Sequence, residues 1–165
     1  MKGYRVGSGF DAHRLVPGRP LMLGGVQVAE DPGLEGHSDG DCLIHALCDA
    51  LLGAAGAGDM GGHFPSSDPR WKGASSLVFL EEVMRVVRAR GFAVENVDVT
   101  VIAQAPPMAP HSASMRRALG RCMGVEEERI SIKAKSTDGL GALGRREGIA
   151  AQATALLRPA DSPAG

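Results

Sequence analysis

Aromatic residues are scarce in this sequence, which has four phenylalanines, one tyrosine and one tryptophan among 165 residues. A hydrophobic core therefore has to be built from Ala, Val, Leu and Met, and self-association would help to bury it. Neither sign of charge predominates, because 18 basic residues and 19 acidic residues give a formal net charge of −1. The overall basic charge typical of nucleic-acid-binding proteins is absent as a global feature, so we expect no nucleic-acid partner.

Long hydrophobic runs and paired cysteines are also missing. The longest segment without a charged residue, 99–115, contains polar side chains and prolines and cannot span a membrane. The first fifteen residues lack the apolar segment of a secretory signal. Three cysteines without a Cys-x-x-Cys spacing are typical of reduced thiols. We therefore expect a cytoplasmic protein with no membrane partner.

The pattern of apolar residues predicts one domain that mixes helices and strands. We expect strands at 4–6, 21–28, 97–103, 129–135 and 148–157, and helices at 41–55, 74–90 and 111–123. This order favours an α+β fold in which helices cover one face of a mixed β-sheet. The domain is placed at residues 1–158, and the breaker-rich residues 159–165 are expected to form a flexible tail.

The last predicted strand carries small apolar side chains along one side, namely Ile149, Ala151, Ala153, Ala155 and Leu157. Such a face suits the packing of one sheet against another and favours an interface between subunits. Burial of the same face within one chain would produce the same pattern.

Two short segments contain residues that can bind a metal ion. Asp11 and His13 are two positions apart, so an extended backbone places both on one face. Asp41, His45 and Asp49 recur every four residues on the first predicted helix, opposite its leucines. Carboxylate and imidazole groups are both zinc ligands, and His45 has apolar neighbours that would half-bury it. The alternative is a solvated acidic face whose aspartates interact favourably with the helix dipole.

Two glycine-rich segments are candidates for substrate binding. The loop at 56–73 is too long to be idle in a compact domain, although an ordinary turn-rich loop has the same composition. Residues 133–148 combine hydroxyl groups and glycines after a strand, and such segments can bind phosphate oxygens. Ordinary turns between strands are, however, commoner than phosphate sites.

Five blocks of sequence occur in a recognisable order, namely GSGFDAHRL at 7–15, GHSDGDCLIHALCDALLGAAGAGDMG at 36–61, FPSSDP at 64–69, VDVTVIAQAP at 97–106 and GLGALGRREGIAA at 139–151. With these blocks the chain resembles the 2-C-methyl-D-erythritol 2,4-cyclodiphosphate synthase family over nearly its whole length. The resemblance implies a phosphorus–oxygen lyase of the non-mevalonate isoprenoid pathway. Such an enzyme cyclises 4-diphosphocytidyl-2-C-methyl-D-erythritol 2-phosphate and releases CMP, as the 2-phosphate attacks the β-phosphate.

The resemblance also implies two metal ions. Asp11, His13 and His45 would hold one zinc ion per subunit and leave its fourth tetrahedral position open for a phosphate oxygen. A second divalent cation, Mg²⁺ or Mn²⁺, would bridge the α- and β-phosphates, with Asp138 as its protein contact.

Substrate and transition-state contacts follow from the same resemblance. His37 and Ser136 would stabilise the transition state, and Ser38 would help His37 to hold the methylerythritol end. The implied substrate-binding residues are Asp11, His13, His37, Ser38, Asp59, Met60, Gly61, Phe64, Asp68, Ala103, Ala105, Pro106, Met108, Ala109, Ala134, Lys135, Ser136, Thr137 and Arg145. Within this set, residues 103–109 would shape the cytosine pocket, and Arg145 would lie near a trimer axis.

The family assembly would be a homotrimer in which three sheets pack around the axis and each active site lies between adjacent subunits. One subunit would supply the zinc half of a site (Asp11, His13, His37 and His45). Its neighbour would supply the cytidine half (residues 103–109 and Ser136). This chain departs from the family pattern at five positions, namely Ser66, Pro107, Ser136, Asp138 and Ala142. The most consequential are Asp138, which replaces a longer glutamate, and Ala142, which replaces a phenylalanine that often lines the central cavity.

Two other functions are compatible with parts of this pattern. A zinc phosphohydrolase could use the same three ligands to activate water, and it would release a phosphomonoester without a cyclic product. A trimeric metabolite-binding module would bind the ligand without turnover, because a fold alone does not determine activity.

Overall fold

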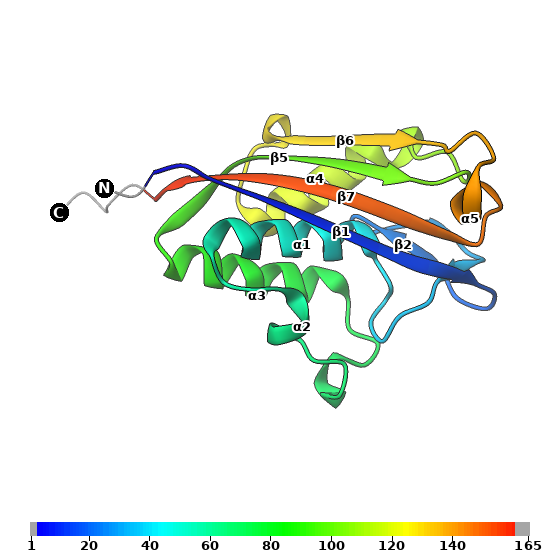
Figure 1. Ribbon diagram of the computed structural model, residues 1–165, viewed down its shortest axis with the longest axis horizontal. Coiled ribbons are helices and arrows are strands. Elements are labelled where there is room, and N and C mark those ends of the chain that lie inside the picture. Colours follow the sequence, from blue (N-terminus) through cyan, green and yellow to red (C-terminus); the bar gives the residue numbers. More distant parts are fainter. Residues whose placement is uncertain (1–2, 161–165) are drawn as a thin grey trace.

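A five-stranded sheet in the order β4-β1-β7-β5-β6 forms the base of the computed structural model, which describes residues 3–160 (Figure 1). Its strands are β1 (Arg5–Val16), β4 (Gly33–Leu34), β5 (Phe92–Ile102), β6 (Ile130–Lys135) and β7 (Gly148–Pro159). β5 and β6 are parallel, whereas β7 is antiparallel to both β1 and β5. The mixed sheet expected from the sequence is therefore confirmed. β2 (Leu21–Leu23) and β3 (Val26–Ala29) form a separate antiparallel hairpin.

Three long helices, α1 (Cys42–Ala55), α3 (Ser76–Ala89) and α4 (Ser112–Met123), cover one face of this sheet (Figure 1). The Asp41 side chain caps α1 by accepting a hydrogen bond from the Ile44 amide, and Gly56 ends the helix in a left-handed conformation. Short helical segments occur at α2 (Met60–His63), η1 (Pro69–Trp71), η2 (Ala109–His111), η3 (Glu127–Arg129) and α5 (Gly141–Gly144). All three helices predicted from apolar periodicity are thus present.

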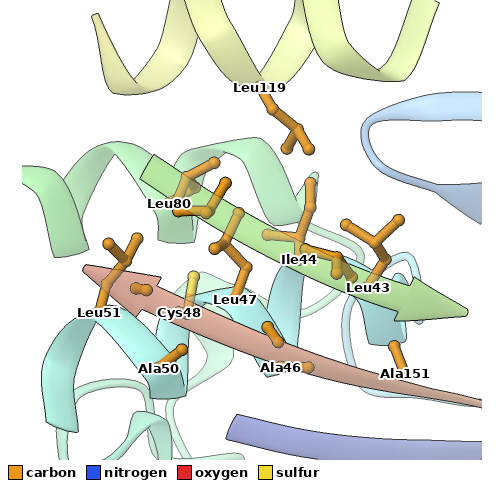
Figure 2. Close-up of a cluster of buried hydrophobic side chains, with 14 of the residues drawn as sticks. Leu43, Ile44, Ala46, Leu47, Cys48, Ala50, Leu51, Leu80, Leu119 and Ala151 are labelled. Carbon is orange, nitrogen blue, oxygen red and sulfur yellow. The ribbon is translucent and has the colours of Figure 1, made fainter. Parts of the chain in front are cut away.

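The core lies between α1, the other long helices and the sheet. Leucine and isoleucine side chains of α1 gather with Leu80 of α3 and Leu119 of α4 (Figure 2). Each of these leucines is fully buried, and such burial stabilises the fold by about 1.5–3 kcal/mol per side chain. The core therefore consists mainly of aliphatic residues, as the scarcity of aromatic residues requires.

An unusually close contact joins α1 to β1. A Cβ atom added at Gly9 would lie 2.0 Å from the Ala46 carbonyl oxygen, and one added at Gly7 would lie 2.1 Å from that of Ala50. No side chain fits between the helix and the strand at these positions. The two glycines share the inner face of β1 with Asp11, so the contact brings α1 directly over the segment that carries two of the candidate metal ligands.

Three predicted strands differ from the structure. β5 begins at Phe92, five residues before the strand predicted at 97–103. β1 extends to Val16 along its pairing with β7, whereas the pattern indicated a strand at 4–6. The longer strand was missed because Gly7, Gly9 and the polar residues that follow hide its apolar alternation. The segment 21–28 is a hairpin rather than one strand. Gly24 and Gly25 have φ angles of 60° and 74°, and they form the turn between β2 and β3.

The expectation that the apolar side of β7 forms a subunit interface is wrong. Ile149, Ala151, Ala153, Ala155 and Leu157 are all buried in the core on the helix-covered face of the sheet. The small alanine side chains let α1 approach the sheet, so burial within one chain explains the pattern. The opposite, helix-free face instead exposes Val6 and Phe10, with 70% and 63% of their surface accessible.

Two further expectations concern the membrane and the tail. Within residues 3–160, none of the helices combines the length and the apolar character needed to cross a membrane. The predicted tail at 159–165 lies largely outside the described residues, which end at position 160. Its first residue, Pro159, belongs to β7 and pairs with Phe92.

Candidate active site

Three potential metal ligands converge between β1 and α1. The Asp11 carboxylate oxygen Oδ2 lies 2.7 Å from His13 Nε2 and 3.0 Å from His45 Nδ1, and the two ring nitrogens are 3.2 Å apart. One ligand atom from each residue lies within 4.8 Å of the others, a spacing that allows all three to bind one ion. The prediction that Asp11, His13 and His45 form a cluster is therefore confirmed.

Local structure explains why these side chains meet. Asp11 and His13 follow Gly9 along the inner face of β1, where alternate residues point toward α1. His45 lies in the first turn of α1, next to the Ala46 carbonyl that contacts Gly9. Because backbone packs against backbone here, the His45 ring reaches the strand without displacing another side chain.

The other two residues of the expected polar stripe on α1 have structural roles. Asp41 is fully buried and accepts hydrogen bonds from the amides of Ile44 and Gly25. Asp49 accepts a 2.8 Å hydrogen bond from the Met60 amide at the start of α2. Of the three residues in the stripe, His45 is therefore the one that enters the cluster.

Protonation within the cluster is set by the contact between Asp11 and the histidines. Burial opposes ionisation of Asp11, but hydrogen bonds with His13 and His45 outweigh it and hold its pKa well below the usual range. The hydrogen bond to Asp11 raises the pKa of His13, against the effect of burial. In the absence of a metal, Asp11 is therefore ionised and His13 holds its proton more tightly than a free histidine.

A pocket of about 180 Å³ opens beside the cluster. Its lining combines polar and aromatic side chains, namely His13, His37, Ser38, His45, Phe64, Ser66, Trp71 and Phe79. The predicted residues His37, Ser38 and Phe64 are thus brought to the metal-binding cluster. Trp71 and Phe79 were not predicted, because nothing in the local sequence places them beside His45.

Aromatic side chains concentrate at this pocket. Three of the six aromatic residues in the chain, Phe64, Trp71 and Phe79, pack against one another with ring centroids 4.9–5.5 Å apart. The Phe79 ring centroid lies 6.0 Å from that of His45. This cluster attaches the long loop at 56–73 to the core, so the loop forms one wall of the pocket.

Arg19 fixes the loop that carries His37 and Ser38. Its guanidinium donates hydrogen bonds to the carbonyl oxygens of Gly36 and Ser38, at 3.2 and 2.8 Å. On the other side of the loop, the Gly73 amide donates to the His37 carbonyl at 2.8 Å. Sequence reasoning missed Arg19, because an arginine in a proline- and glycine-rich turn carries no signal of its distant partner.

The predicted substrate-binding residues Asp59, Met60, Gly61 and Asp68 are held by local hydrogen bonds. Asp59 caps α2 by accepting a hydrogen bond from the Gly62 amide at 2.9 Å, and Met60 and Gly61 begin that helix. Asp68 caps η1 and forms an ion pair with Arg70 at 2.6 Å. The hydrogen bond from Arg70 lowers the pKa of the Asp68 carboxyl group. These side chains lie on the same loop as Phe64 but are not among the residues that line the metal pocket.

A second pocket, of about 410 Å³, lies between η2 and β6. Its lining contains the predicted residues Met108, Ala109 and Ala134, together with Ser112, Ile132 and Lys133, which the prediction omitted. Ala103 is tied to the end of β6 by a 2.9 Å hydrogen bond from its amide to the Lys135 carbonyl. Ala105 and Pro106 instead line a separate apolar pocket beside Leu15 and Pro32. The segment 103–109 is thus divided between two pockets.

The remaining predicted residues lie in the exposed turn after β6. The Ser136 hydroxyl donates a 2.8 Å hydrogen bond to the Asp138 carboxylate, and the Thr137 hydroxyl donates to the Leu140 carbonyl. Arg145 forms an ion pair with Glu147 at 2.6 Å. Within residues 3–160, no hydrogen bond joins this turn to the metal-binding cluster.

Comparison with known proteins identifies relatives along most of the chain. The YgbB family model matches residues 4–158. A 2-C-methyl-D-erythritol 2,4-cyclodiphosphate synthase from Bordetella avium is 54% identical, over 93% of this chain and 95% of its own length.

Solved structures give the same result. The bifunctional IspDF from Campylobacter jejuni matches with a TM-score of 0.93 and 40% identity, over 96% of this chain and 43% of that longer one. A CDP-bound 2C-methyl-D-erythritol-2,4-cyclodiphosphate synthase matches with a TM-score of 0.85 and 42% identity, over 93% and 99% of the two chains. The chain therefore belongs to the YgbB family, whose relatives found here are 2-C-methyl-D-erythritol 2,4-cyclodiphosphate synthases.

Proposed function

We propose that this protein converts 4-diphosphocytidyl-2-C-methyl-D-erythritol 2-phosphate into 2-C-methyl-D-erythritol 2,4-cyclodiphosphate and CMP. The observation that carries this proposal is the convergence of Asp11, His13 and His45 beside a pocket that also contains His37 and Ser38. The sequence similarity to named synthases over nearly the whole chain supports the same reaction. The three cysteines are unpaired in the structure, in keeping with a cytoplasmic enzyme.

Asp11, His13 and His45 would hold a zinc ion in this proposal. Two imidazoles and one carboxylate are a donor set typical of catalytic zinc, and they leave room for one further ligand. When bound, zinc would act as a Lewis acid that neutralises charge on a phosphate oxygen. Asp138 is the proposed protein contact for a second divalent cation, Mg²⁺ or Mn²⁺. In the metal-free chain its carboxylate accepts the hydrogen bond from Ser136.

The protein's own groups have to orient the substrate. A phosphate oxyanion is already a nucleophile, so the attack of the 2-phosphate on the β-phosphorus needs no strong base. His37 and Ser38, which line the pocket and are held through the Arg19 contacts, would bind the phosphate and the methylerythritol end. The Ser136 hydroxyl would stabilise charge that develops on the leaving CMP phosphate.

A homotrimer with shared active sites completes the proposal. The metal pocket and the pocket between η2 and β6 have no lining residue in common, which supports assembly of a site from two chains. The helix-free face of the sheet exposes Val6 and Phe10, as expected of a face that packs around a trimer axis. The residues that would form the interface are therefore those of this face, and not the buried alanines of β7.

Product analysis tests the reaction directly. The purified protein is incubated with zinc, Mg²⁺ and the CDP-linked 2-phosphate, and the products are followed by ³¹P NMR. We expect the two coupled phosphorus signals of a cyclic diphosphate, together with CMP. A phosphomonoester without a cyclic product would indicate a hydrolase, and an unchanged substrate would indicate a binding module.

Replacing Ser136 with alanine is expected to lower kcat by about 10²-fold, because the hydroxyl is assigned to charge that develops in the transition state. The affinity for CMP should change by less than about threefold, since the interaction is weak in the ground state. Steady-state kinetics and CMP titration separate the two effects. Ser114→Ala on α4 is a matched control. Unchanged turnover of Ser136→Ala would remove this hydroxyl from the mechanism.

Zinc should stabilise the protein more at high pH than at low pH. The pKa of His13 is raised above its ordinary value of 6.5, so zinc has to displace a tightly held proton as pH falls. Without metal, the contribution of His13 to stability has the opposite pH dependence. The raised pKa stabilises the metal-free fold fully below pH 6.5, and this contribution is lost as pH rises through the raised value. Asp11 remains ionised throughout this range.

We therefore expect the increase in Tm caused by zinc to be larger near pH 8 than near pH 6. Thermal unfolding is measured at both pH values with saturating chelator and with excess zinc. An equal increase at the two pH values would argue against His13 as a ligand.

A further inference from the structure

The second ring nitrogen of His45 has its own buried partners. While Nδ1 faces Asp11 and His13, Nε2 lies 3.1 Å from the Ser76 hydroxyl oxygen and 3.3 Å from that of Ser38. Ser76 is the first residue of α3 and is fully buried, so solvent does not compete for its hydroxyl. The other hydrogen-bond partners of Ser76 therefore determine whether its hydroxyl donates to the His45 ring or accepts from it.

Ser76 is bound on its other side to the carboxylate of Asp39. Its hydroxyl donates a hydrogen bond to Asp39 Oδ1, and its amide donates one to Asp39 Oδ2 at 2.9 Å. The Asp41 amide also donates to Oδ1, at 3.1 Å. An ionised carboxylate can only accept hydrogen bonds, so the single hydroxyl proton of Ser76 is committed to Asp39. The Ser76 oxygen then remains as an acceptor for a proton on His45 Nε2.

This directionality selects one tautomer of His45. With the ring proton held on Nε2 in this way, a metal ion bound by Asp11 and His13 would take the place of the Nδ1 hydrogen bond to Asp11 and meet the lone pair of Nδ1. The contacts also fix the rotation of the ring, because it is held at both nitrogens. His13 is held differently, through a backbone hydrogen bond with Glu35.

We infer that Ser76 and Asp39 are positioning residues that hold His45 in the orientation and tautomer required to bind a metal. Neither contacts the Asp11 or His13 side of the ring. This inference rests on the proposed metal-binding function. Partners of this kind behind a ligating histidine typically change metal affinity by about 10–100-fold when they are removed.

The test compares Ser76→Ala with Ser75→Ala. The neighbouring Ser75 caps the same helix through the Leu77 amide and does not contact His45, so its replacement controls for effects on α3. Zinc affinity is measured by competition with a chromophoric chelator, and the Tm of each metal-free variant is measured alongside. We expect zinc affinity to fall about 10–100-fold in Ser76→Ala and less than about threefold in Ser75→Ala. Equal affinities in the two variants would overturn the inference.

Asp39 provides a second, independent variant. If Asp39 acts through Ser76, then Asp39→Asn should also weaken zinc binding, and the double variant with Ser76→Ala should lose much less than the product of the two single effects. Fully multiplicative effects would show that Asp39 does not act through Ser76. Ser76→Thr keeps the hydroxyl group. We expect it to bind zinc more tightly than Ser76→Ala, and the opposite order would also count against the inference.

The wild-type protein separates this inference from the proposed function. If the wild type binds about one zinc per chain and Ser76→Ala binds it equally tightly, the positioning role is wrong and the metal site stands. If the wild type binds no zinc in the same assay, the proposed metal site itself is wrong.

Discussion

The variant His45→Ala is expected to lose its bound zinc and to turn over at least about 10³-fold more slowly than the wild type. The two remaining ligands, Asp11 and His13, lie two positions apart on one strand and would not hold the ion against water. The fold should persist without the metal, because the site lies at a pocket and the aliphatic core does not depend on it. Elemental analysis, kinetics and thermal unfolding of the metal-free proteins measure the three expectations.

His63→Ala is the matched control for this variant. The His63 ring hydrogen-bonds the Ala57 carbonyl at 2.8 Å, and it is not one of the three clustered ligands. The control should keep its zinc and most of its activity. Zinc retained by His45→Ala at the wild-type level would show that the metal binds elsewhere.

Co-expression of two inactive variants, His45→Ala and Ser136→Ala, should restore about a quarter of the active sites. In a cyclic trimer each site would take its metal half from one chain and its cytidine half from the next. A site is intact when its metal half comes from the Ser136 variant and its cytidine half from the His45 variant. Each condition is met with a probability of about one half in random assembly.

Trimers assembled separately and mixed afterwards provide the comparison for this experiment. They should regain little activity if subunits exchange slowly across the proposed interface, which would contain exposed apolar side chains such as Val6 and Phe10. Mass spectrometry of differently tagged chains verifies that mixed trimers are present. Verified mixed trimers with no activity would place the whole site within one chain.

The candidate metal ligands could be picked out because their signals are local, and the family resemblance grouped Asp11, His13 and His45 into one site. Asp11 and His13 share a strand face by their two-residue spacing, and His45 stands out as a polar residue on an apolar helix. Ser76, Asp39 and Arg19 could not be found in this way. Ser76 lies 31 positions from His45, and its role appears only when α3 packs beside α1. Serine at the start of a helix is otherwise expected for capping alone.

The mixed class of the sheet was predicted correctly, but what covers the apolar side of β7 was not. Alternation along β7 showed which residues share a side, and the structure confirms that grouping. Alternation does not show what covers that side. The apolar side of β7 is covered within the chain because α1 packs closely on the sheet, with its alanines against the glycines of β1. Helix packing of this kind depends on backbone distance, which single-residue patterns do not encode.

The contact between Gly9 and Ala46 also bears on which ions the site can accept. Because backbone meets backbone there, the distance between His45 and the two ligands of β1 is fixed by hard contacts rather than by adjustable side chains. Ions that need longer bonds or six to eight oxygen ligands, such as Ca²⁺, would require α1 to move away from the sheet. A small ion that prefers nitrogen ligands and four-fold coordination fits without such movement. The two glycines of β1 would thus favour a small ion at the proposed site, although neither belongs to the cluster of ligands.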